Sequence, residues 1–133
     1  MRRLVTIGWS VLLAGSAAAE PDMADVYCHT PCADCGTVVK IGRDTGGTTR
    51  MSVGTDSFVG VRYLFKDLEV SITTSGSETV FETKPPGRRS ATLTLAEGRP
   101  GCCHLLRYDG LLTMESDGNI QQLRIGCTAR LPQ

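Results

Sequence analysis

Apolar residues recur at every second position over most of the chain after residue 37, and this period limits the fold more than any other feature. Side chains two residues apart share one face of a β-strand, whereas a helix face needs spacings of three and four. Val39 and Ile41 alternate in this way, and so do Leu93 and Leu95. The intervening residues are polar, so one face of each strand meets water, which is typical of antiparallel sheets.

Clusters of Gly, Pro, Asp and Ser interrupt the alternation at residues 44–47, 75–77, 85–87, 109–110 and 116–119. Recurring turns of this kind are typical of small β-barrels and β-sandwiches. We therefore expect an all-β domain, either a small antiparallel barrel or a two-sheet sandwich, with about seven to nine short strands.

The alternation and the turns also predict the side-chain faces of residues 59–72 and the strands after residue 104. Val59, Val61, Tyr63 and Phe65 are expected on one face of a strand, and a separate strand should follow over residues 68–72. The segment after residue 104 is predicted to be a three-stranded meander with turns at 109–110 and 116–119.

The N-terminus has the three parts of a secretory signal. Arg2 and Arg3 precede an apolar run over residues 4–15, and three alanines stand at 17–19. We expect cleavage before Glu20, which would leave 114 of the 133 residues. The apolar run is shorter than the roughly 20 residues of a membrane-spanning helix, so the mature chain should have no membrane span. Residues 1–19 are then a signal peptide, and the protein is expected in the periplasm or outside the cell.

The mature chain has the length of a single domain. Residues 20–36 are expected to form a cysteine-rich N-terminal loop that belongs to the same globular unit as the β domain over residues 37–133. Removing Arg2 and Arg3 from the 14 basic residues leaves 12, against 14 acidic ones. This near-neutral balance argues against a nucleic-acid partner and against binding to a membrane surface.

All six cysteines follow the signal segment: Cys28, Cys32, Cys35, Cys102, Cys103 and Cys127. An even number in an exported chain predicts three disulfides, with the pairing left open by the sequence. Cys102 and Cys103 should point to opposite faces of a strand and take different partners. The meander would place Cys127 far from both, which favours bridges between the N-terminal and C-terminal groups.

A metal-binding or thiol-redox protein is the alternative. Residues of the types that bind zinc or copper(I) gather around the cysteines. They are Cys28, His29, Cys32, Cys35, Cys103 and His104. An oxidising compartment favours disulfides over thiolate ligands, and no helix follows the Cys32-x-x-Cys35 pair as a thioredoxin-type site requires. We therefore expect no cofactor.

Catalytic signatures are absent from the sequence, including G-x-S-x-G, H-E-x-x-H and the phosphate-binding G-x-x-x-x-G-K-[ST]. The two histidines each adjoin a cysteine, and nothing near either one in the sequence indicates the nucleophile of a Ser/His/Asp triad. No catalytic residue can be nominated, and the sequence favours a binding module over an enzyme.

The most distinctive polar segment is Lys84-Pro85-Pro86-Gly87-Arg88-Arg89. Two prolines stiffen it, and a rigid turn loses little entropy on docking. Its cations, Lys84, Arg88 and Arg89, suit an anionic groove on a protein partner. The sequence thus favours a non-enzymatic binding or inhibitor module of the cell envelope, a class that includes periplasmic lysozyme inhibitors and immunity proteins. A structural accessory subunit of an envelope complex is a further alternative.

Overall fold

The computed structural model describes residues 25–31, 36–57, 59–84 and 89–130. The predicted signal peptide, Cys32, Cys35 and Arg88 lie outside the described residues. Nine strands are present in the described part: β1 (Asp25–His29), β2 (Thr37–Arg43), β3 (Thr49–Ser57), β4 (Gly60–Ser75), β5 (Glu78–Thr83), β6 (Arg89–Leu95), β7 (Arg99–Pro100), β8 (Leu105–Ser116) and β9 (Asn119–Arg130). No segment in this part is a helix that could cross a membrane.

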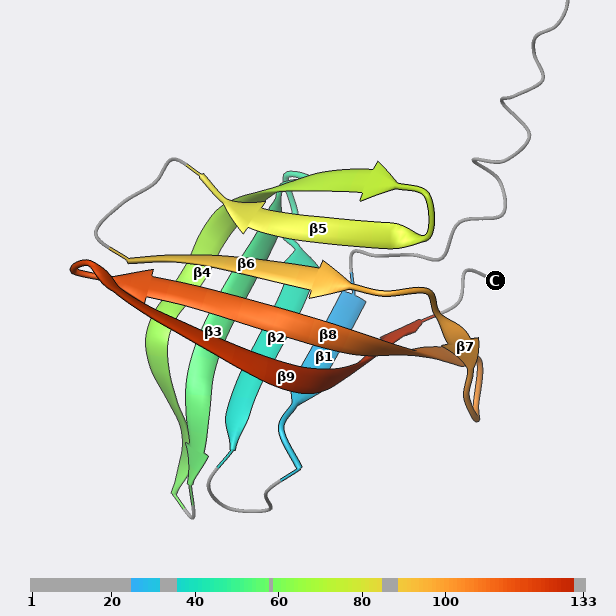
Figure 1. Cartoon of the computed structure of the whole chain (residues 1–133), viewed down its shortest axis with the longest axis horizontal. Helices are drawn as coiled ribbons and strands as arrows, with labels where there is room; N and C mark the ends of the chain where they lie inside the picture. Colours follow the sequence, from blue (N-terminus) through green and yellow to red (C-terminus); the bar gives the residue numbers. More distant parts are fainter. Residues whose placement is uncertain (1–24, 32–35, 58, 85–88, 131–133) are drawn as a thin grey trace, which may run out of the picture.

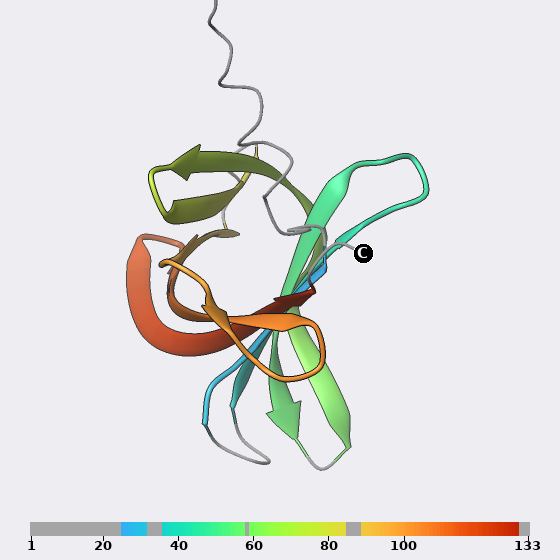
Figure 2. The same cartoon turned by 90° about the vertical axis from the view of Figure 1, so that its right-hand side faces the viewer.

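Eight of the strands form a closed antiparallel barrel (Figures 1 and 2). Strands β1 to β6 pair in chain order, β6 pairs with β8, β8 with β9, and β9 with β1. The two-residue strand β7 is an addition that pairs with the start of β8. Of the two predicted architectures, the all-β barrel is confirmed. Asp25–His29, expected within an N-terminal loop, instead supplies the strand that closes the barrel.

The core fills the barrel with one side-chain face of each strand. Phe81, Met51 and Leu93 are its largest fully buried members. The alternation seen in the sequence places Val39 and Ile41 there, and these side chains are almost completely buried. Eight strands enclose a space that side chains can fill, so the interior is a packed core.

The C-terminal segment is a two-stranded hairpin, and the predicted turn at Asp109-Gly110 is wrong. Strand β8 runs through both residues and pairs with β9 along its whole length. A Cβ atom on Gly110 would lie 3.2 Å from the Cys127 sulfur and 3.2 Å from the Ile125 side chain. A glycine inside a strand often marks such a close approach, so Gly110 serves packing here instead of a turn. The turn at Asp117-Gly118 is confirmed, with both residues at positive φ.

Strand β4 is continuous where two strands were predicted, because two irregularities keep it paired with β3. Ser52 of β3 faces both Lys66 and Asp67, and the Asp67 amide donates to the Ser52 hydroxyl over 2.9 Å. The second register shift falls at Leu64. A β-bulge adds one residue and changes which face the next side chain takes.

The bulge at Leu64 overturns the prediction that Tyr63 and Phe65 share a face. Phe65 packs against the core, whereas Tyr63 is 36% exposed. Val59 is 96% exposed and lies outside the strand. Strict period-two alternation cannot reveal a bulge, because the extra residue leaves no mark in the apolar pattern.

Candidate functional site

The disulfide predicted to join the two ends of the chain is present between Cys28 and Cys127. The two residues are register partners on β1 and β9, the strands that close the barrel. Both are buried, at 0% and 3% exposure. This bridge is part of the core, which removes Cys28 from any metal site.

Cys102 and Cys103 do not lie on opposite faces of a strand as predicted. They lie in a turn after β7, where the Leu105 amide donates to the Cys102 carbonyl over 3.1 Å and Cys103 has a φ of 64°. Their sulfur atoms are 2.8 Å apart, on the same side of the chain. Because β8 and β9 pair fully, Cys127 lies opposite Tyr108 at this same end of the hairpin, which corrects the expected separation.

Neither cysteine of this turn is bonded to another cysteine within the described residues, and both are exposed. A thiol contact with Cys102 raises the pKa of Cys103 above its ordinary value, which disfavours the thiolate at neutral pH. The raised pKa of Cys103 makes it a poorer thiolate ligand for a metal.

Within the described part of the chain, the two histidines do not gather with the cysteines into a metal-binding cluster. The His29 ring contacts the Thr30 carbonyl, and its Nε2 lies 3.3 Å from the Asp56 carboxylate. His104 is exposed in the Cys102–Cys103 turn. Among the residues with described positions, no three His, Cys, Asp or Glu side chains come together. Cys32 and Cys35 lie outside the described residues, so their predicted roles stay predictions.

The main candidate site is a groove of about 440 Å³ at one end of the barrel, which we call the mouth groove. It lies between Leu64 and Phe65 of β4, the start of β6 and the tip of the β8–β9 hairpin. The start of β6 and this hairpin tip are on the left in Figure 1. Its lining residues are Leu64, Phe65, Arg89, Met114, Glu115, Ser116, Asp117, Asn119 and Gln121. Mouths of β-barrels are common places for binding sites.

Arg89 brings the positive charge of the predicted Lys84–Arg89 segment to this groove. It begins β6 and shares the inward face of that strand with Ala91, and it pairs in register with Ser116 of β8. Its Nη1 donates to the carbonyl of Leu64 over 2.8 Å. That carbonyl belongs to the bulge in β4, where ladder pairing is interrupted. The bulge thus fixes the direction of the arginine.

Lys84, at the other end of the segment, lies outside the groove. Its Nζ is 3.4 Å from the Glu69 carboxylate, and both side chains are about half exposed. Its amide also donates to the Glu69 carbonyl, which anchors the chain just after β5. Arg88 falls outside the described residues, and of the two described cations, Lys84 and Arg89, only Arg89 lines the groove.

The floor of the groove was missed by sequence reasoning. Phe65 and Met114 are half-buried and pack against the core, and Leu64 is 44% exposed beside them. Each looks like an ordinary strand residue in the sequence. Their place in the strands is what could have identified these residues. An inward side chain at the end of a barrel strand is not covered by a further layer of core side chains, so it lines the mouth of the barrel.

The groove combines apolar, cationic and acidic surface. Arg89 can donate several hydrogen bonds from one planar group, since arginine has five N–H donors. Glu115 and Asp117 contribute carboxylates at the rim, next to the amide side chains of Asn119 and Gln121. This set suits recognition, because it offers donors and acceptors around an apolar centre.

Comparisons with protein-family models, with curated proteins and with solved structures found no match to this chain.

Proposed function

We propose that this protein is an exported binding or inhibitor module of the cell envelope that captures a protein partner without catalysis. The observation that carries the proposal is the placement of Arg89 in the mouth groove, over an apolar floor. An arginine beside a desolvated apolar pocket, within a polar rim, is the anatomy of an interface hot spot.

The partner contact follows from the chemistry of the groove. An aromatic or aliphatic side chain fits the floor made by Phe65 and Met114, and a neighbouring carboxylate fits Arg89. Arg88 adds a second cation next to Arg89 in the sequence, whereas the charge of Lys84 is paired with Glu69. The partner surface that this site complements is therefore an apolar side chain with one carboxylate beside it for Arg89 and with hydrogen-bond donors for Glu115 and Asp117.

A second candidate function rests on the Cys102–Cys103 turn. Two exposed thiols with sulfurs 2.8 Å apart can exchange with a disulfide or bind a soft metal such as copper(I). The raised pKa of Cys103 lowers its reactivity at neutral pH, which ranks this candidate below protein capture.

Binding measurements on single variants test the proposal. The immobilised mature protein is exposed to an envelope extract, the captured protein is purified, and its dissociation constant is measured in 0.1 M and 1 M salt. We expect Arg89→Ala to weaken the complex by about tenfold or more, as a central arginine anchor does. High salt should weaken it too, since the Debye length falls from about 10 Å to about 3 Å.

Arg124→Ala is the matched control, because Arg124 is an exposed arginine on the outer side of β9 and does not line the groove. It should leave the dissociation constant unchanged. If Arg89→Ala binds as tightly as the wild type while remaining folded, the mouth groove is not the contact surface and the proposal fails.

A further inference from the structure

A second surface lies on the outer side of the barrel, centred on Tyr27. The residues beside it follow from strand register: Arg107 pairs with Thr128, Thr128 with Tyr27, and Tyr27 with Lys40. Neighbouring strands are about 4.8 Å apart, so Arg107 and Lys40 flank the tyrosine at opposite sides of a row about 14 Å wide. Tyr27 is 45% exposed although its strand lies in the middle of the sheet. We call this row and the hollows beside it the Tyr27 face.

Two hollows meet at Tyr27. One, of about 450 Å³, extends over β2, β3 and β4 and includes Lys40, Lys66 and Tyr63. The other, of about 420 Å³, extends over β8 and β9 and includes Arg107. A large exposed aromatic ring between two hollows is a platform on which a flat ligand can stack.

Glycine keeps the second hollow open. Gly126 of β9 pairs with His29 of β1 and lines this hollow. A Cβ atom placed on Gly126 would meet no atom within 4 Å, so the space above it is empty. The sheet surface beside Tyr27 is therefore bare, and a ligand can approach the backbone closely.

On this face, several acidic side chains form ion pairs, whereas several basic side chains do not. The carboxylates of Asp25, Asp44 and Asp109 form ion pairs with Arg130, Arg50 and Arg99, at 3.5, 2.8 and 3.0 Å. The cations nearest the tyrosines have no such partner among the described residues; they are Lys40, Arg43, Lys66 and Arg107. Lys66 instead lies 5.3 Å from the centre of the Tyr63 ring. The face thus presents uncompensated positive charge together with two tyrosines.

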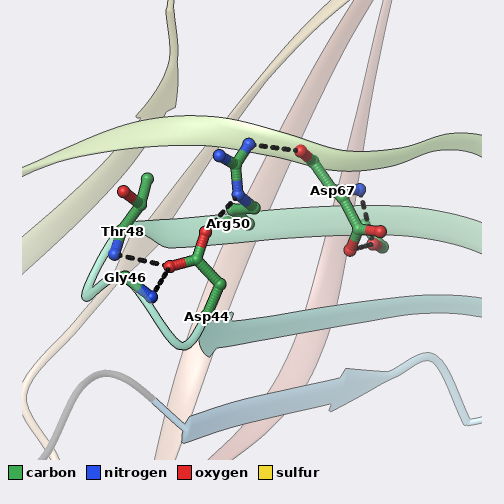
Figure 3. A network of polar contacts seen from close by, with 6 residues as sticks. Asp44, Gly46, Thr48, Arg50 and Asp67 are labelled. Carbon is green, nitrogen blue, oxygen red and sulfur yellow. Dashed lines mark hydrogen bonds and ion pairs between the residues drawn. The ribbon is translucent and has the colours of Figure 1, made fainter.

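The carboxylate of Asp44, which lines the first hollow, is held in place by a local network (Figure 3). Asp44 accepts hydrogen bonds from the amides of Gly46 and Thr48, each over 2.9 Å, and from Arg50 Nε over 2.8 Å. Arg50 Nη1 donates to the Asp67 carbonyl over 3.1 Å and so ties the β2–β3 turn to β4. This network fixes the wall of the hollow before any ligand arrives.

We propose that the Tyr27 face binds an acidic polysaccharide, in which sugar rings carry carboxylate groups. The apolar face of a sugar ring stacks on Tyr27, and the acidic groups meet Lys40 and Arg107. The ring hydroxyls donate to carboxylates in the hollows, as Asp67 and Asp109 can accept them. Single-stranded nucleic acid also stacks on aromatic residues in basic grooves, but it has few hydroxyl groups to donate to the carboxylates of Asp67 and Asp109. A face that carries both cations and carboxylates therefore favours an anionic ligand that also has many hydroxyl groups.

This site is separate from the mouth groove, because the two share no lining residue. The inference consequently does not depend on the proposed protein partner. Variants of one site serve as controls for the other, so failure of one proposal can be distinguished from failure of the other.

The test uses the mature protein, a short oligogalacturonate as the acidic probe, and a maltooligosaccharide of equal length as the neutral comparison. Amide chemical shifts in the NMR spectrum locate binding, and calorimetry gives the dissociation constant. Shifts at Tyr27, Lys40 and Gly126 with the acidic probe, reduced in high salt, support the proposal. Equal binding of the neutral sugar overturns its electrostatic part, and no binding of either overturns the proposal. Tighter binding of an oligothymidylate at the same residues would also overturn it in favour of nucleic acid.

Substitutions then separate recognition from folding. Tyr27→Ala should weaken binding about tenfold, equal to about 1.4 kcal/mol, while Tyr27→Phe keeps the ring and retains binding. Lys40→Ala and Arg107→Ala should each weaken it by about two- to fivefold, since exposed charge pairs are individually weak.

Gly126→Val is the sharpest variant, because its Cβ would enter the hollow with no atom within 4 Å and because valine suits a strand. It should abolish binding while the melting temperature stays equal or rises. Arg89→Ala should leave sugar binding unchanged. Wild-type affinity in both Gly126→Val and Tyr27→Ala would refute the site.

Discussion

Replacing Cys28 and Cys127 together with alanine should remove a large part of the protein's conformational stability. The bridge spans 99 residues of sequence, nearly the whole described chain. In the chain-entropy account, a cross-link closing a loop of about 100 residues restricts the unfolded chain by about 4.7 kcal/mol. Domains of this size are stable by only about 5–15 kcal/mol, so the loss is comparable with the total.

Urea unfolding followed by circular dichroism measures this loss, with free energies extrapolated to water. The double variant should unfold at a much lower urea concentration than the wild type. Cys102→Ser with Cys103→Ser is the matched control, because both residues are exposed and should change stability by only about 0.5 kcal/mol. A loss below about 1 kcal/mol for the Cys28 and Cys127 variant would refute the reasoning. It would mean that the β1–β9 ladder alone closes the barrel.

Three further predictions concern the core, a turn and a carboxylate. Phe81→Ala should cost about 3–5 kcal/mol in the same unfolding assay, because Phe81 is completely buried; a smaller loss would mean that the barrel collapses around the cavity. Gly118→Ala should cost about 1–2 kcal/mol, since Gly118 has a φ of 86° and the cost is conformational alone; an unchanged midpoint would argue against that backbone geometry. The hydrogen bond from Arg50 lowers the pKa of Asp44, so its contribution to stability is present above about pH 4 and is lost as the pH falls through the folded-state pKa. A carboxyl NMR titration should show this lowered pKa in the wild type, and Arg50→Ala should return it toward the ordinary value.

The fold was predictable because its determinants are local. Alternation and turn residues gave the all-β class, and Asp117-Gly118 marked a hairpin correctly. Asp109-Gly110 is the same dipeptide, but Gly110 lies under the Cys127 sulfur and Asp109 forms an ion pair with Arg99. The difference between these dipeptides is tertiary, since only the folded barrel brings the disulfide to one of them.

The candidate sites were less predictable, because bulges and register create them. The bulge at Leu64 turns Phe65 inward and frees the carbonyl that holds Arg89. Arg89 itself was found by its place in a basic, proline-rich turn. Tyr27 gave no signal, because it stands next to a cysteine in what was expected to be a loop. Its exposure follows only from the pairing of β1 between β2 and β9.

The sequence has equal numbers of basic and acidic residues, but neither the mouth groove nor the Tyr27 face has this balance. Asp109 and Asp25 on the barrel's outer side are paired with arginines, whereas Lys40 and Arg107 beside Tyr27 are uncompensated among the described residues. Net charge governs solubility and long-range attraction, but a bound ligand responds to the charges within a Debye length of about 8–10 Å. A neutral total is therefore compatible with an anion-binding face. A near-neutral composition therefore does not by itself exclude a charged polymer as ligand when folding pairs the acidic side chains and leaves cations unpaired.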